Sequence, residues 1–149
     1  MRAAIRAAAL TLLDGYKAAN AGSLKQTFQA RPASISPPCG FVDGIDENEI
    51  AYTPAGMQRT PAVRIRLVRG TFSSGDVAEA NDALVDGFID YVVENLHAAG
   101  ANTISLITSV EDDDGWVPEW IQPSPGNEPR PYYSTIVTLG GEGLFGGVT

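Results

Sequence analysis

The sequence predicts an α+β fold, in which helices pack on one face of an antiparallel or mixed sheet of about four strands. Two segments, 2–21 and 74–100, repeat apolar residues at helical spacing. Three others, 62–68, 103–110 and 132–139, alternate apolar and polar residues as half-buried strands do. The order along the chain is helix, strand, irregular arm, strand, helix, strand and strand. This order is typical of an α+β domain, and 149 residues suit a single domain with its own core.

The first helix is expected from Arg2 to Ala21, with Gly22 ending it. Its apolar face comprises Ile5, Ala9, Leu12 and Tyr16. The segment faintly resembles a signal peptide, but Asp14 and Lys17 interrupt its apolar residues. We therefore expect an amphipathic helix of the mature protein. Residues 23–30 then alternate polar and apolar side chains, which predicts a first strand with one solvated face.

Residues 31–61 break the regular patterns with repeated prolines and glycines, and only 41–42 and 50–53 look extended. A connection of this length is unusual, because most connections in compact domains are about 4–6 residues long. Its apolar residues are Ile35, Phe41, Ile45, Ile50, Tyr52 and Met57. That content is too high for a solvated linker. We predict an extended arm or hairpin that packs against another surface, with a second chain as one candidate.

The strand at 62–68 places Val63, Ile65 and Leu67 on one side and Arg64 and Arg66 on the other. Arg69 follows closely. Three interpretations of these arginines stay open: a phosphate-binding site, the solvated face of a strand, or a docking surface for an acidic helix of a neighbouring copy.

The helix at 74–100 has serines and Asp76 at its start and Gly100 at its end, as capping rules favour. Its apolar face comprises Val77, Ala80, Leu84, Phe88, Tyr91 and Val92. Its opposite face is acidic and comprises Asp76, Glu79, Asp82, Asp86, Asp90 and Glu94. Such a helix lies with one face on a core and the other in water or against a basic partner. We single out Asp82, Asp86 and Asp90 as candidate interface residues.

The last third of the chain adds an acidic turn at 111–115, a loop to 131, a strand at 132–139 and a flexible glycine-rich tail at 140–149. Trp116 and Trp120 flank a proline after the acidic turn. They either cap the core or anchor an interface, where tryptophan is enriched.

Charge is unevenly distributed along the chain. Residues 1–42 carry a net +4, residues 43–75 are neutral, and residues from 76 onward carry −12, for a total of −8. This balance disfavours nucleic-acid binding over most of the surface. A basic half and an acidic half suit head-to-tail contact between copies. No apolar run is long enough to cross a bilayer, so no membrane partner is expected.

No catalytic, cofactor or metal site is expected. The acidic runs at 111–114 and 43–49 lack the ligand spacing of a calcium loop. Cys39 and His97 are the only cysteine and histidine. A catalytic pair between them is much less favoured than a buried or partly buried thiol and a surface imidazole. No disulfide framework or phosphate-binding fingerprint occurs.

The layout resembles the tail terminators, or tail completion proteins, of long-tailed bacteriophages. The resemblance covers most of the chain and lies in diffuse motifs, without any catalytic residue. These are the N-terminal helix Arg2–Ala21, the proline-broken segment ending Arg59-Thr60-Pro61, the strand Ala62–Val68, the helix containing Asn81–Asp86, a tryptophan-bearing acidic turn and the strand beginning Tyr132-Tyr133-Ser134-Thr135.

The resemblance implies a structural virion subunit, made in the host cytoplasm and not an enzyme. It would assemble into a homo-hexameric ring at the head-proximal end of the tail tube, stop tube polymerisation and offer a docking surface to the head connector or stopper. DNA would pass through the ring without sequence-specific binding. Arg64, Arg66 and the acidic helix face would then lie near subunit or tube contacts. One alternative is another neck role, as a head–tail connector or stopper. The alternative from a different class is a carboxylate–metal hydrolase using Asp112 and Asp114.

Overall fold

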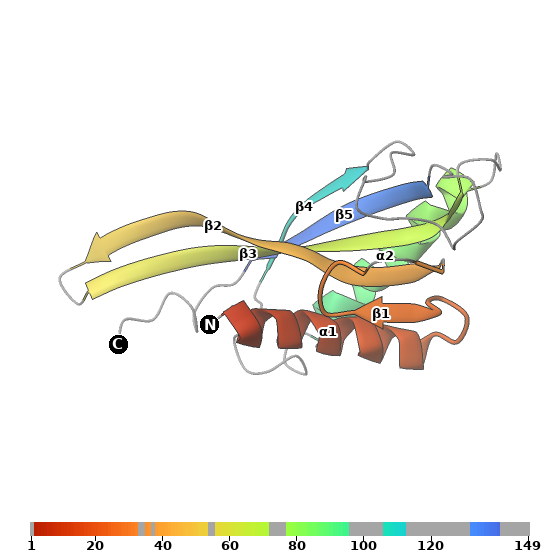
Figure 1. Cartoon of the computed structure of the whole chain (residues 1–149), viewed down its shortest axis with the longest axis horizontal. Coiled ribbons are helices and arrows are strands. Elements are labelled where there is room, and N and C mark those ends of the chain that lie inside the picture. The colour runs from red at the N-terminus through yellow and green to blue at the C-terminus, as the bar shows by residue number, and fades with distance from the viewer. Residues whose placement is uncertain are drawn as a thin grey trace.

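In the part of the chain that the structure describes, two helices pack on a mixed β-sheet, so the predicted α+β class is confirmed (Figure 1). The computed structural model describes residues 2–32, 35–36, 38–53, 56–71, 77–95, 106–112 and 132–140. The helices are α1 (Arg2–Ala19) and α2 (Val77–Asn95). The strands are β1 (Gln26–Phe28), β2 (Cys39–Thr53), β3 (Gly56–Thr71), β4 (Leu106–Asp112) and β5 (Tyr132–Gly140).

The described sheet has five strands in the order β1-β2-β3-β5-β4, compared with the four or so that the sequence predicts. The additional strand is β2, which lies in the segment expected to be irregular. β1 corresponds to the strand expected at 23–30 but is only three residues long. β1 pairs parallel to β2, and the other three pairs are antiparallel. The sheet is therefore mixed, with its single parallel pair at one edge.

β2 and β3 form a hairpin that is much longer than the sequence patterns indicate. The two strands stay paired from Cys39↔Val68 to Thr53↔Gly56. β5 accompanies β3 only as far as Ala62, which pairs with Gly140. Beyond that point residues 47–53 and 56–61 form a two-stranded ribbon that projects from the sheet (Figure 1). Pro61 lies where β5 no longer accompanies β3, which suits a residue without a backbone N–H.

Both helices cover the same face of the sheet. Val63, Ile65 and Leu67 of β3 point to this face, as the alternation predicts, and are buried. They join Val137 and Leu139 of β5 in one cluster with the helices. The helix side chains in this cluster include Ile5, Ala9, Leu12, Leu13, Tyr16, Leu84, Val85, Phe88 and Val92. The apolar face of each helix is thus the face that it buries against the sheet.

Close packing between the helices relies on two glycines. The ring of Tyr16 meets Phe88 edge-on at 5.7 Å between centroids and tilts against Tyr91 at 5.9 Å. Gly87 lies directly beside the Tyr16 hydroxyl, which would be 2.6 Å from a Cβ at that position. Gly15 lies in the same way against the hydroxyl of Tyr91. The tyrosine of each helix therefore packs over a glycine of the other.

Replacing Gly87 with alanine is expected to destabilise the protein more than replacing Gly15. Tyr16 is only 5% exposed and has little room to move, whereas Tyr91 is half-buried and its ring can swing outward. Overpacking in a core costs about 1–3 kcal/mol. We expect Gly87→Ala to fall in that range, measured by urea denaturation. Gly15→Ala serves as the matched variant, and equal or reversed losses would contradict the packing described here.

A second, smaller apolar cluster lies on the other face of the sheet. Cys39 and Phe41 of β2 pack there with Val68 of β3 and with Ile35, from the segment that joins β1 to β2. The Cys39 side chain is fully buried, and burial raises the pKa of its thiol to about 12. The buried thiol anticipated from the sequence is therefore present.

The unfolding free energy is expected to fall as the pH rises above about 9. Unfolding exposes the Cys39 thiol, whose pKa then drops from about 12 to its ordinary 9.0, so alkali favours the unfolded thiolate. Burial also raises the pKa of Tyr16, with the same sign. The thiol contribution is complete below pH 9 and is lost as the pH approaches 12. Urea denaturation across this range should show the decline, and Cys39→Ala should flatten it; an unchanged slope in that variant would contradict the assignment.

Candidate functional site

A cluster of charged side chains occupies the sheet face that the helices leave uncovered. Arg64 and Arg66 point to this face from β3, because they alternate with the core residues of that strand. Asp43 joins them from β2, where the register with β3 shifts between Val42 and Gly44. The bulge leaves Asp43 without a partner residue in β3, beside Gly44 and opposite Arg64, and returns Ile45 to the helix side. Arg64 lies directly over Gly44, which leaves space for its guanidinium.

Asp43 is the centre of this cluster. Arg66 donates from Nη2 to Asp43 Oδ2 at 3.4 Å and from Nη1 to the Ser134 hydroxyl at 3.0 Å. Arg31 donates from Nε to both Asp43 Oδ1, at 3.0 Å, and the Asp43 backbone carbonyl, at 3.1 Å. Arg64 Nη1 lies 3.9 Å from Asp43 Oδ2. The Asp43 carboxylate thus contacts three guanidinium groups, two from β3 and one from the segment that joins β1 to β2.

Burial divides the roles of these arginines. The side chains of Asp43 and Arg66 are 1% and 6% exposed, whereas those of Arg64 and Arg31 are 33% and 47% exposed. Burial lowers the pKa of Arg66, and the neighbouring Asp43 offsets only part of this shift. Arg66 is therefore held inside the domain, and Arg31 and Arg64 are the members of the cluster that solvent reaches.

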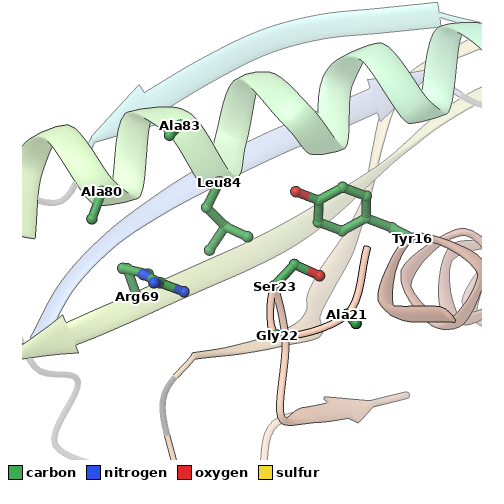
Figure 2. A pocket seen from close by; sticks show the side chains of 8 residues that line it. All are labelled: Tyr16, Ala21, Gly22, Ser23, Arg69, Ala80, Ala83 and Leu84. Carbon is green, nitrogen blue, oxygen red and sulfur yellow. The ribbon is translucent and has the colours of Figure 1, made fainter. Parts of the chain in front are cut away.

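Arg69 does not belong to this cluster. Arg69 continues the alternating series of Val63, Ile65 and Leu67, which face the helices. Arg69 therefore lies on the helix side of the sheet, where it lines an open hollow of about 330 Å³ between α2 and the turn after α1 (Figure 2). The hollow is also lined by Tyr16, Ser23, Ala80, Ala83 and Leu84. The three arginines that are neighbours in sequence thus serve two separate places.

The acidic candidates Asp82, Asp86 and Asp90 are exposed along α2. The same helix directs Leu84 and Phe88 into the core. Since α2 covers one face of the sheet and the Asp43 cluster lies on the other, the acidic surface and the exposed arginines occupy opposite sides of the domain. The sequence alone predicts both sets of charges but does not predict this placement.

Other candidates fall partly outside the described residues. Trp116, Trp120, His97 and Asp114 all lie outside them, as does the tail at 141–149. Asp112 is the last residue of β4 and pairs with Thr135. Within the described ranges, no group of three or more His, Cys, Asp and Glu side chains is arranged to hold a metal ion. No helix in the described part of the chain is long and apolar enough to cross a membrane.

Two features of the site have no counterpart in the sequence analysis. In the sequence, Asp43 stands only within an acidic run that lacks the spacing of a calcium loop, and Arg31 is one of several basic residues near the N-terminus. The signal that joins them is the β-bulge, which depends on the pairing of β2 with β3.

Comparison with known proteins adds no family: none of the protein-family models matches the chain, and no curated protein is significantly similar to it.

Proposed function

We propose that this protein is a structural virion subunit that forms a ring at the head-proximal end of a bacteriophage tail tube. There it would end tube polymerisation and provide the surface on which the head docks. The observation that carries the proposal is the placement of opposite charges on opposite sides of one small domain. Exposed aspartates line α2, and the exposed Arg31 and the partly exposed Arg64 lie on the far face of the sheet. The tail-terminator layout seen in the sequence supports the same assignment.

Opposite faces of opposite charge favour a head-to-tail contact. In such a contact, one surface of a subunit meets a different surface of the next, and the assembly closes into a ring when the rotation between subunits allows it. Charge complementarity then sets the orientation of neighbours and excludes contacts between like faces. We assign the α2 aspartates to one side of this contact and Arg31 and Arg64 to the other.

The ribbon formed by residues 47–53 and 56–61 gives the subunit a second means of reaching a neighbour. A two-stranded hairpin is only marginally stable in water by itself. Packing against another chain would stabilise a ribbon that extends beyond the five-stranded body (Figure 1). The net charge of −8 also suits a ring through which DNA moves, because an acidic wall does not hold phosphates.

Measurement of the assembled mass tests the proposal. We expect a hexamer in native mass spectrometry or light scattering that weakens in high salt, because salt screens exposed charges. The combined variant Asp82→Asn, Asp86→Asn and Asp90→Asn should shift the mass toward the monomer. Asp14→Asn, an exposed change on α1, is the control and should assemble normally.

Electron microscopy of tails assembled with the protein gives the second measurement. A ring at the end of the tube that meets the head supports the tail-terminator role, whereas a ring bound to the head portal would indicate a connector or stopper. A monomer at high concentration, unaffected by salt and leaving no ring on tails, would overturn the proposal.

A further inference from the structure

The hollow beside Arg69 combines one cationic side chain with a small apolar wall. Arg69 extends from the end of β3 toward the space between Leu84 of α2 and the turn that holds Ser23 (Figure 2). We propose that this hollow binds a carboxylate group carried on a short aliphatic stem, with the Arg69 guanidinium as the ion-pair partner. The inference does not depend on the ring proposed above.

Arg69 is available for such a ligand. Its side chain is half-buried, and among the described residues no carboxylate lies within 4.0 Å of it and no hydrogen bond from it is formed. Arg64 and Arg66, by contrast, contact Asp43 on the other face. A guanidinium presents paired N–H donors in a planar fork that matches the two oxygens of a carboxylate. The chemistry of the hollow therefore favours a carboxylate over a neutral polar group.

Tyr16 supplies a second polar atom to the same space. Its ring is buried between the helices and its hydroxyl lies beside Gly87, one turn along α2 from Ala83. Burial raises the pKa of Tyr16, although Arg69 lowers it to a smaller extent. The phenol therefore remains protonated at neutral pH and can donate a hydrogen bond. The Ser23 hydroxyl already donates to the carbonyl of Asn20, at 2.6 Å, and so helps to fix the turn.

The remaining wall limits the ligand by size and polarity. Ala80, Ala83 and Leu84 of α2 present small apolar groups, against which a stem of one or two methylenes can pack. A volume of about 330 Å³ is at the lower end for ligand sites, which usually measure about 300–1,000 Å³. Two sources provide this chemistry: a free short-chain acid, or an aspartate or glutamate side chain of a second copy of this acidic protein.

Titration of the full chain with sodium propionate, followed by NMR of the Tyr16 ring and the Leu84 methyl groups, tests the first source. Propionamide, which has the same shape without the charge, is the ligand control. We expect saturable shifts with propionate only, and Arg69→Met should weaken binding about tenfold or more, as loss of a charged hydrogen bond does. Lys25→Met, an exposed change outside the hollow, should bind as the wild type does. Arg69→Lys, which keeps the charge but not the planar fork, should bind with intermediate affinity.

The assembled mass of the same variants tests the second source. If a carboxylate of a second copy occupies the hollow, Arg69→Met should reduce self-association while Lys25→Met does not, and added propionate should compete in the wild type. Propionate binding without any effect on mass assigns the site to a free acid. The proposal is overturned if Arg69→Met alters neither propionate binding nor self-association. A ring that still assembles in Arg69→Met leaves the charge-face proposal standing, so the two ideas fail separately.

Discussion

Replacing Phe88 with alanine is expected to lower the free energy of unfolding by about 3–5 kcal/mol, the usual cost of deleting a buried phenylalanine. Phe88 is completely buried and belongs to the cluster that joins both helices to the sheet. Its ring also meets Tyr16 edge-on at 5.7 Å, a contact that an alanine cannot make. Loss of this side chain leaves a cavity where α1, α2 and β3 meet.

Urea denaturation followed by circular dichroism measures this loss. Val93→Ala is the matched control, because Val93 belongs to the same helix and is 62% exposed. We expect that change to alter stability by no more than about 0.5 kcal/mol, as exposed substitutions usually do. Comparable losses in the two variants would show that α2 does not bury the face described here.

Replacing Asp43 with alanine should cost about 3 kcal/mol. The carboxylate is almost fully buried and accepts hydrogen bonds from Arg66 and Arg31. Removing one partner of a buried ion pair typically costs about 3–5 kcal/mol, because the remaining charge loses its compensation. We expect the lower end of this range, since Arg31 is half exposed and the Ser134 hydroxyl still accepts from Arg66. Asp86→Ala, on the exposed face of α2, should be nearly neutral.

A double variant separates loss of the ion pair from simple loss of packing. If Asp43 acts mainly by compensating Arg66, then Asp43→Ala with Arg66→Met should be less destabilising than the sum of the single changes. Additive losses would contradict direct coupling between the two side chains. Both variants that lack the Asp43 carboxylate should also loosen the segment after β1, because Arg31 holds that segment to the sheet through Asp43.

Phe88→Ala and Asp43→Ala should also differ in their effect on self-association. Phe88 stabilises the body of the domain without reaching the surface, whereas Asp43 holds Arg31 and Arg64 near the face that we propose as one side of the subunit contact. An Asp43→Ala variant that remains folded but no longer self-associates would place the defect at that contact. A folded Phe88 variant should still assemble.

The sequence by itself determined the parts of the fold that depend on local periodicity. The helix expected at Arg2–Ala21 appears as Arg2–Ala19, and the face with Ile5, Leu12 and Tyr16 is the buried one. The alternation of Val63, Ile65 and Leu67 against Arg64 and Arg66 likewise gave the correct orientation of β3. Such patterns are readable because burial of one face acts on residues only a few positions apart.

Only the tertiary structure decided how far β2 extends and where each charge lies. The hairpin is held by pairing to β3, and prolines and glycines in residues 31–61 conceal that pairing from a local pattern. The register shift at Asp43 leaves this residue beside Gly44, opposite Arg64 in the arginine cluster, and returns Ile45 to the face that the helices cover. A shift of one residue reverses the face that a strand side chain occupies, and its position follows from contacts between distant strands. The sequence therefore shows which residues are charged, but the register of the sheet decides which surfaces they form together.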